Sequence, residues 1–263
     1  MARDASDPME AEFDTVAEWT AQVAADLGPE YFVPAACRGS GQPVALDWLL
    51  TGLRAGPGDL LLDVGAGIGG PAAYAVDRTG VRPVLVEPEP DACRAAARLF
   101  GAPVIQADAT ALPFADGAVG LAWSLGVLCT ASGREAQLAM LLQMRRVVRP
   151  GGRIGLLVYL AVTGELDDPP EGNHFPTSTD LHTLLRSADL DVLAVAASQD
   201  MPQPPASWHE RTAAVERELQ RRCGQNPQFA AAAGQSGRIG HLLDIGQLSS
   251  EVILLSREYE GEP

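Results

Sequence analysis

The sequence predicts an α/β fold with a mostly parallel sheet and helices on both faces. Short apolar runs bounded by turn formers alternate with longer segments of helical periodicity along most of the chain. Strands that alternate with helices pair in parallel, because each helix returns the chain to the same edge of the sheet. A glycine-rich turn, Gly65 to Gly70, directly follows the apolar run 59–64. Such a turn at the carboxyl end of a strand is where these folds bind nucleotide-like ligands.

The individual elements follow from periodicity and punctuation. Residues 9–27 have the apolar spacing of an amphipathic helix, and a second helix over 43–54 opens with Pro43. Short apolar runs that end at polar or turn-forming residues predict strands near 59–64, 82–87, 103–106, 118–124, 152–159, 190–198 and 251–258. Helical periodicity between them predicts helices at 70–79, 89–99, 134–148 and 178–188.

A long insertion, residues 199–249, separates the last two predicted strands. It opens with a proline-rich stretch and contains expected helices at 207–222, 229–233 and 241–245. A connection of this length is not an idle linker. The chain is therefore divided into an N-terminal helical cap segment (1–57), a core (58–198), a helical lid insertion (199–249), and a last core strand with a tail (250–263).

The glycine turn is compatible with two classes of ligand. Gly65, Gly67 and Gly70 have the G-x-G-x-x-G spacing of dinucleotide sites, which is a weak signal alone. Gly65, Gly67 and Gly69 have the spacing G-x-G-x-G, with Asp63 two residues ahead. A carboxylate would repel a diphosphate, whereas it suits a ligand that carries cations. A tight turn without any ligand is the remaining alternative.

The second spacing resembles motif I of the class I S-adenosylmethionine (SAM) methyltransferases, and SAM carries a sulfonium and an α-ammonium. Glu87 ends the next apolar run, about 20 residues on, where an acid bonds ribose hydroxyls in nucleotide-binding folds. The stretch Asp108-Ala109-Thr110-Ala111-Leu112-Pro113-Phe114 resembles the family pattern D-A-x-x-L-P-F, although Asp108 alone could be a helix N-cap. Arg149-Pro150-Gly151-Gly152 resembles the family's turn before the fifth strand.

The resemblance covers roughly residues 58–198 and the last strand. It implies a Rossmann-like sheet of seven strands, one of them antiparallel, with SAM as cofactor and S-adenosylhomocysteine as product. The residues that it places at the cofactor are Asp63, Gly65, Gly67, Gly69, Glu87, Pro88, Asp108, Ala109 and Ser124. In small-molecule enzymes of this family, insertions such as 199–249 form a lid with the N-terminal helices.

Composition limits the partners and the compartment. The chain has 263 residues and a net charge of −15, and all of its basic residues are arginines, so the basic patch that binds nucleic acid is not expected. No apolar run is long enough for a membrane span, and a signal-peptide pattern is lacking. The four cysteines are scattered without metal-site spacing. We therefore expect a cytoplasmic monomer or homodimer without a structural metal.

The absence of three family motifs limits the class of molecule that accepts the methyl group. Trp123-Ser124-Leu125-Gly126 occupies the place of the D/N-P-P-Y/F motif of amino-methylating enzymes. Leu128 precedes Cys129, so the Pro-Cys nucleophile of cytosine methylation is lacking. Neither Ser124 nor Gly126 replaces the aspartate ligands of the Mg²⁺-dependent enzymes. These gaps favour metal-independent transfer to O, N or C of a small molecule, including a secondary metabolite.

Several side chains are candidates for acceptor contacts. His174 follows the fifth strand and is a candidate general base, or a loop residue packed beside Phe175. Arg38 is a candidate partner of the SAM carboxylate, or a solvated charge. Four further residues either line the acceptor pocket or serve as surface and packing residues: Tyr31, Trp208, His209 and His241.

Three hypotheses for the function follow. The first is small-molecule methyl transfer, driven mainly by proximity and orientation. The second is a methyltransferase fold that catalyses a cyclisation or rearrangement, and the third is a non-catalytic SAM-binding subunit. An intact cofactor loop does not separate them, because it indicates binding and not transfer.

Overall fold

The computed structural model describes residues 14–257. Its centre is a seven-stranded sheet in the order β3-β2-β1-β4-β5-β7-β6. The strands are β1 (Leu60–Val64), β2 (Arg82–Glu87), β3 (Val104–Gln106), β4 (Val119–Leu125), β5 (Val148–Ala161), β6 (Asp191–Ala197) and β7 (Leu248–Ser256). Only β7 runs antiparallel to its neighbours in this sheet, which confirms the predicted fold class.

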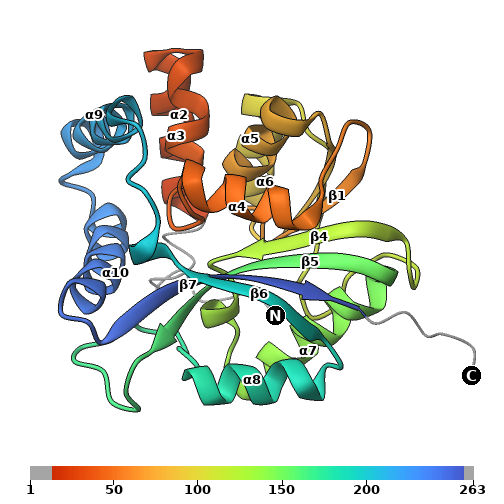
Figure 1. Cartoon of the computed structure of the whole chain (residues 1–263). Coiled ribbons are helices and arrows are strands. Elements are labelled where there is room, and N and C mark those ends of the chain that lie inside the picture. The colour runs from red at the N-terminus through yellow and green to blue at the C-terminus, as the bar shows by residue number, and fades with distance from the viewer. Residues whose placement is uncertain (1–13, 258–263) are drawn as a thin grey trace, which may run out of the picture.

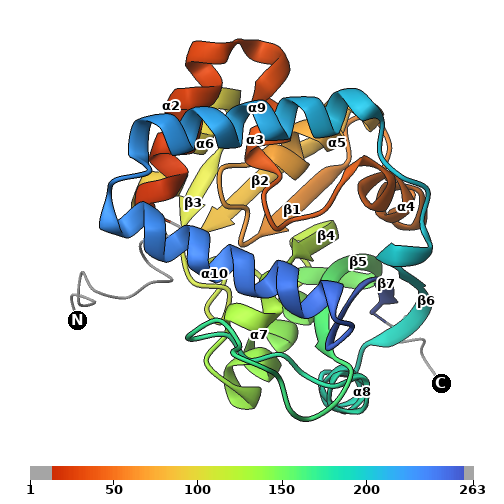
Figure 2. The same ribbon diagram turned by 90° about the vertical axis from the view of Figure 1, so that its left-hand side faces the viewer.

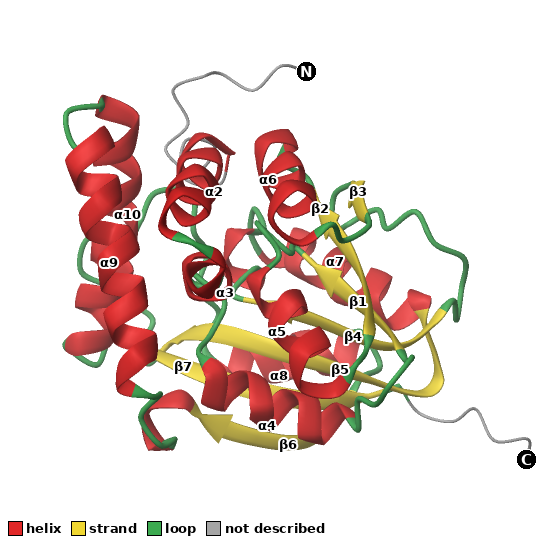
Figure 3. Ribbon diagram, turned by 90° about the horizontal axis from the view of Figure 1, so that it is seen from above, coloured by secondary structure: helices red, strands yellow, loops and turns green. Residues whose placement is uncertain are grey.

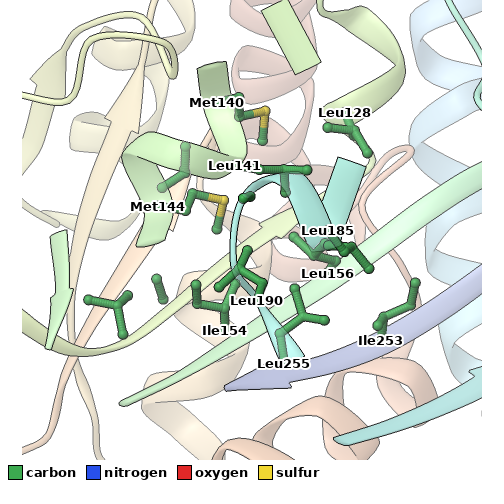
Figure 4. Close-up of a cluster of buried hydrophobic side chains, with 14 of the residues drawn as sticks. Leu128, Met140, Leu141, Met144, Ile154, Leu156, Leu185, Leu190, Ile253 and Leu255 are labelled. Carbon is green, nitrogen blue, oxygen red and sulfur yellow. The ribbon is translucent and has the colours of Figure 1, made fainter. Parts of the chain in front are cut away.

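Helices cover both faces of the sheet (Figure 1). One face carries α4 (Pro43–Leu53), α5 (Gly70–Thr79) and α6 (Pro90–Phe100), and the other carries α7 (Arg134–Val147) and α8 (Ser178–Ser187). The α7 and α8 side is sealed by aliphatic and methionine side chains from the helices and the central strands (Figure 4). On the opposite side Trp123 is fully buried among leucines of α4.

The N-terminal segment and the insertion pack together. The N-terminal segment forms α2 (Val16–Leu27), a 3-10 turn (Pro29–Tyr31) and α3 (Phe32–Ala36), and the insertion forms α9 (Ala206–Cys223) and α10 (Pro227–Asp244). These helices lie side by side beyond the strand ends (Figures 2 and 3). Their shared apolar cluster contains Val16, Val23, Val215, Leu219 and Phe229. An ion pair between Arg222 and Asp26 joins α9 to α2.

Some expected boundaries were wrong. The insertion contains one continuous helix, α10, where the sequence predicted separate helices at 229–233 and 241–245. Its glycine-rich middle is held from outside, because the Gln235 amide exchanges two 3.1 Å hydrogen bonds with the backbone of Glu171. Strand β5 is longer than the predicted 152–159, since it pairs with β7 along its whole second half. The part of the predicted helix 9–27 that precedes residue 14 lies outside the described residues.

None of the helices within residues 14–257 has both the length and the apolar character that a bilayer crossing requires.

Close backbone contact at Gly70 fixes α3 against the start of α5. A Cβ built on Gly70 would lie 2.5 Å from the carbonyl carbon of Ala36. We predict that Gly70→Ala lowers the free energy of unfolding by about 1–3 kcal/mol, because backbone cannot give way as a side chain can. Chemical denaturation measures this change. Gly234→Ala is the control: it lies within α10 with nothing within 4 Å of its Cβ position, and it should raise stability by about 0.5–1 kcal/mol. Equal effects of the two substitutions would contradict the packing argument.

Candidate functional site

The glycine turn after β1 is hydrogen-bonded to the end of β2. The N–H groups of Gly65 and Ala66 both donate to the Val86 carbonyl, at 2.8 and 3.0 Å. Gly65 has a φ of +74°, and a Cβ there would lie 2.5 Å from a Val127 methyl carbon. Gly67 has a φ of +54°, but apart from its chain neighbours no atom of residues 14–257 lies within 4 Å of its Cβ position. The turn is therefore closed at Gly65 and open at Gly67, which leaves room for a ligand beside Gly67.

Glu87, at the end of β2, is part of the turn itself. Its Oε2 accepts a 2.7 Å hydrogen bond from the Gly67 N–H, and its Oε1 accepts one of 3.1 Å from the Glu89 N–H. The side chain is 5% exposed. Each carboxylate oxygen has a second lone pair, so both oxygens can still accept a ligand hydroxyl. The predicted ribose contact is compatible with this arrangement and remains a prediction.

Asp63 is the least satisfied polar group of the site. It is 2% exposed, and its Oδ2 has no hydrogen-bond partner among residues 14–257. Trp123 pairs with it in register across β1 and β4, and its buried indole N–H lies near the carboxyl but makes no well-formed hydrogen bond within residues 14–257. A buried polar atom without a partner is destabilising, and a carboxylate more so. The unpartnered Oδ2 therefore suits a cationic ligand group.

Burial raises the pKa of both acids. For Asp63 the pKa rises to about 7, with the Glu87 charge adding to the rise and the nearby Trp123 N–H opposing it. For Glu87 the pKa also rises to about 7, although the Glu89 and Gly67 N–H groups oppose the change. The two carboxyls therefore change protonation state near neutral pH.

Other predicted cofactor residues have contacts within the protein. The Ser124 hydroxyl is buried and donates to the Val64 carbonyl at 2.7 Å, so it joins β4 to β1. The Pro88 carbonyl accepts from the Gln106 amide at 3.1 Å. Asp108 Oδ1 accepts 2.7 Å hydrogen bonds from both the N–H and the hydroxyl of Thr110. Asp108 therefore stabilises a turn, and Ala109 lies within that turn; the alternative of a helix N-cap is wrong.

The segment after α3 lies across the ends of β4 and β5. A Cβ on Gly126 would be 2.4 Å from the Gly39 carbonyl oxygen, and the Tyr159 hydroxyl donates to the same oxygen at 3.2 Å. Arg38 is exposed beside these contacts. Sequence reasoning missed Tyr159, although a tyrosine near the carboxyl end of a predicted strand was a usable signal. Together these contacts hold the Arg38 segment at the mouth of the site.

His174 lies in a neighbouring cavity. Its backbone N–H donates to the Cys129 carbonyl, and its carbonyl accepts from the Gln137 amide, both at 2.7 Å. The exposed side chain lines a recess of about 380 Å³ with Arg134 and Asn173. None of the glycine-turn residues lines this recess. The structure thus ties His174 to the loop after β4 but does not place it in the same cavity as the turn.

The remaining candidates lie on or beside α9 and α10. Tyr31 and Trp208 are half-buried and pack against the apolar clusters, as packing anchors do. His209 on α9 and His241 on α10 are exposed. Within residues 14–257, no group of three or more His, Cys, Asp or Glu side chains is arranged to hold a metal ion.

Comparison with known proteins agrees with this geometry. Residues 62–156 match the family model described as a methyltransferase domain. These residues form a methyltransferase domain. They include the glycine turn, Glu87 and the Asp108 turn, which are the elements of the candidate site.

One curated relative, methyltransferase GfsG from Streptomyces halstedii, is 32% identical over 118 residues. The match covers 42% of this chain and 41% of the relative, so the chain spans less than half of that protein. Among solved structures, the [4+2]-cyclase SpnF has a TM-score of 0.61 at 20% identity and covers 81% of this chain and 80% of its own.

A second solved structure is geranyl diphosphate C-methyltransferase from Streptomyces coelicolor A3(2), in complex with Mg²⁺, geranyl diphosphate and S-adenosyl-L-homocysteine. It has a TM-score of 0.59 at 16% identity and covers 81% of this chain and 76% of its own. At these identities the two structures establish the fold of the methyltransferase domain and nothing finer.

The raised pKa values predict a specific pH dependence of stability. A carboxyl with a higher pKa in the folded state stabilises the fold below its ordinary pKa, and that stabilisation is lost as pH rises through the folded value. For Asp63 and Glu87 the window runs from ordinary values of 3.8 and 4.5 to about 7. Urea unfolding should show that the wild type loses stability between pH 4.5 and pH 7.5. In Asp63→Asn this loss should be smaller, by on the order of a few kcal/mol.

The control for this experiment is Asp77→Asn, which removes an exposed carboxylate on α5. Its pH profile should follow the wild type. Parallel profiles for the wild type and Asp63→Asn would show that Asp63 has an ordinary pKa in the folded protein.

Proposed function

We propose that this chain is a SAM-dependent methyltransferase that transfers a methyl group to O, N or C of a small molecule. The observation that carries the proposal is the buried Asp63 carboxylate, whose Oδ2 has no partner beside a turn that is open at Gly67. A cofactor with a sulfonium and an α-ammonium would compensate this charge, whereas the diphosphate of NAD would be repelled by it.

Different residues of the site would bind different parts of the cofactor. Glu87 would accept from the ribose hydroxyls through the lone pairs that the Gly67 and Glu89 N–H groups leave free. The Asp108 carboxylate is exposed and already accepts from Thr110. It would also accept a hydrogen bond from the adenine amino group beside Ala109. Arg38 would pair with the carboxylate of the methionine moiety. Ser124 would act indirectly, because its hydroxyl fixes the ends of β1 and β4.

When bound, the cofactor supplies an electrophilic methyl group, and transfer is an in-line displacement. The chain then needs mainly to orient the two reactants, which can contribute about 7–11 kcal/mol. The hydrogen bond from Tyr159 to Gly39 and the packing of Ala36 on Gly70 would hold the N-terminal helical segment over the site. Helices α9 and α10 would complete the enclosure and exclude water from the reacting groups.

A cyclisation or rearrangement is the second candidate function. It is favoured by one observation, the similarity in fold to the [4+2]-cyclase SpnF over 81% of the chain. A site that binds the cofactor without consuming it would use the same turn. Incubation with candidate acceptors and measurement of S-adenosylhomocysteine tests methyl transfer: tight SAM binding with no product from any acceptor would contradict it and leave the cyclase and the non-catalytic SAM-binding functions.

SAM affinity tests the assignment of Asp63. Titration calorimetry at pH 8 should show at least a tenfold weaker Kd in Asp63→Asn, because a charge-assisted interaction is lost. Asp77→Asn should bind like the wild type. Wild-type affinity should fall as pH decreases below about 7, where Asp63 gains a proton. Unchanged affinity in Asp63→Asn at pH 8 would remove the observation on which the proposal rests.

His174 is proposed as a contact for the acceptor or as its general base. With an active acceptor, His174→Gln should lower kcat/KM for that acceptor at least tenfold and leave the Kd for SAM unchanged. His182→Gln is the control, since His182 is exposed on α8 and bonds to Ser178 of its own helix. Similar kinetics for the two variants would assign His174 to the surface.

A further inference from the structure

A second cavity lies at the opposite edge of the sheet from the glycine turn. It has a volume of about 460 Å³ and is lined by residues at the starts of β1 and β4 and by the first part of β5. The glycine turn follows the carboxyl end of β1, whereas this cavity is at the amino ends of the same strands. It therefore does not belong to the proposed cofactor site.

Three arginines line this cavity. The guanidinium of Arg149 lies over Gly120, where a Cβ would be only 3.2–3.3 Å from it. Arg153 is half-buried and donates to the Gly52 carbonyl. Arg54 ends α4 with a φ of +57°, a left-handed conformation that is rare for a long side chain. The fold thus brings together side chains that are separated by about a hundred residues in sequence.

These three arginines have no ion pair within the described part of the chain, although the protein is strongly acidic. In contrast, Arg78 pairs with Asp47 and Arg98 pairs with Glu18. Burial and the positive charge of Arg54 both lower the pKa of Arg153, as expected for a cation with a like-charged neighbour. Asp59 is the acidic residue in the lining, and its Oδ2 accepts from the Gly56 N–H at 3.0 Å. The lining therefore has three positive charges and one negative charge.

We propose that this cavity binds a small molecule carrying a phosphate or diphosphate group. Guanidinium groups match phosphate oxygens with paired N–H donors, and three of them would neutralise a diphosphate. The volume is within the range of small-molecule sites. A recess surrounded by an acidic protein favours a compact ligand over a nucleic acid, which requires an extended basic surface. Occupancy would stabilise or regulate the protein from the edge opposite the reaction.

The chain itself contains carboxylates that could compete with a phosphate for this cavity. The Gly151 N–H donates to the Arg257 carbonyl at 2.9 Å, and the Arg257 N–H donates to the Gly152 carbonyl at 3.2 Å. Gly151 and Gly152 line the cavity, and the sequence that follows Arg257 contains Glu258, Glu260 and Glu262. The experiment must therefore separate an external phosphate from these glutamates.

Titration calorimetry of the full chain with sodium diphosphate, at ionic strength held constant with NaCl, tests the proposal. The wild type should bind, and Arg54→Gln/Arg149→Gln should bind at least tenfold more weakly. Both side chains are exposed, so the double variant should fold, and circular dichroism checks this. Arg186→Gln/Arg217→Gln removes the same charge from two other exposed helix positions and should stay within twofold of the wild type. Asp59→Asn should bind a few-fold more tightly.

Three results would overturn the proposal. One is no heat of binding in the wild type, and another is equal affinity in the two double arginine variants. The third is binding that appears only after residues 258–263 are removed, which would identify the chain's own glutamates as the occupant. Equal affinity of the truncated and full chains would support an external ligand. Because SAM binding is not measured, failure here leaves the proposed function standing.

Discussion

Burial of two carboxylates at the carboxyl edge of the sheet is the constraint on which the site depends. An ionised carboxylate taken out of water is strongly destabilising unless hydrogen bonds or a cation compensate it. Glu87 is compensated by two backbone N–H groups of its own neighbourhood, at 2.7 and 3.1 Å. Asp63 is compensated less, since one of its oxygens has no hydrogen-bond partner in the part of the chain that the structure describes. The fold thus retains an incompletely compensated acid at the point where a positively charged cofactor would lie, as expected where binding, and not stability, selects the residue.

Close backbone approach determines how the surrounding elements are arranged. Val127 covers Gly65, Ala36 covers Gly70, and the Gly39 carbonyl covers Gly126, in each case at a distance that excludes a side chain. These contacts connect the turn after β1, the loop after β4 and the N-terminal segment. Helices α9 and α10 are attached to the same N-terminal segment through apolar packing and the ion pair between Arg222 and Asp26.

The two edges of the sheet have opposite electrostatic character. The carboxyl edge holds the buried acids Asp63 and Glu87, and the amino edge holds Arg54, Arg149 and Arg153 around a separate cavity. The two sets share no side chain, so a ligand at one edge would not compete for side chains with a ligand at the other. The arginine cluster is also the part of the protein that the methyltransferase resemblance does not explain, because there Arg149 and Arg153 belong only to a turn and a strand.

The sequence alone determined the order of strands and helices, the glycine turn and the acids that follow it, because these depend on local periodicity and on spacing along the chain. It did not determine the continuity of α10, whose glycine-rich middle is held by Glu171 from another loop. Nor did it determine that Ser124 bonds to Val64, that Tyr159 holds Gly39, or that His174 lines a recess apart from the turn. Those contacts join strands and loops that are far apart in the sequence, and only the packed sheet brings them together.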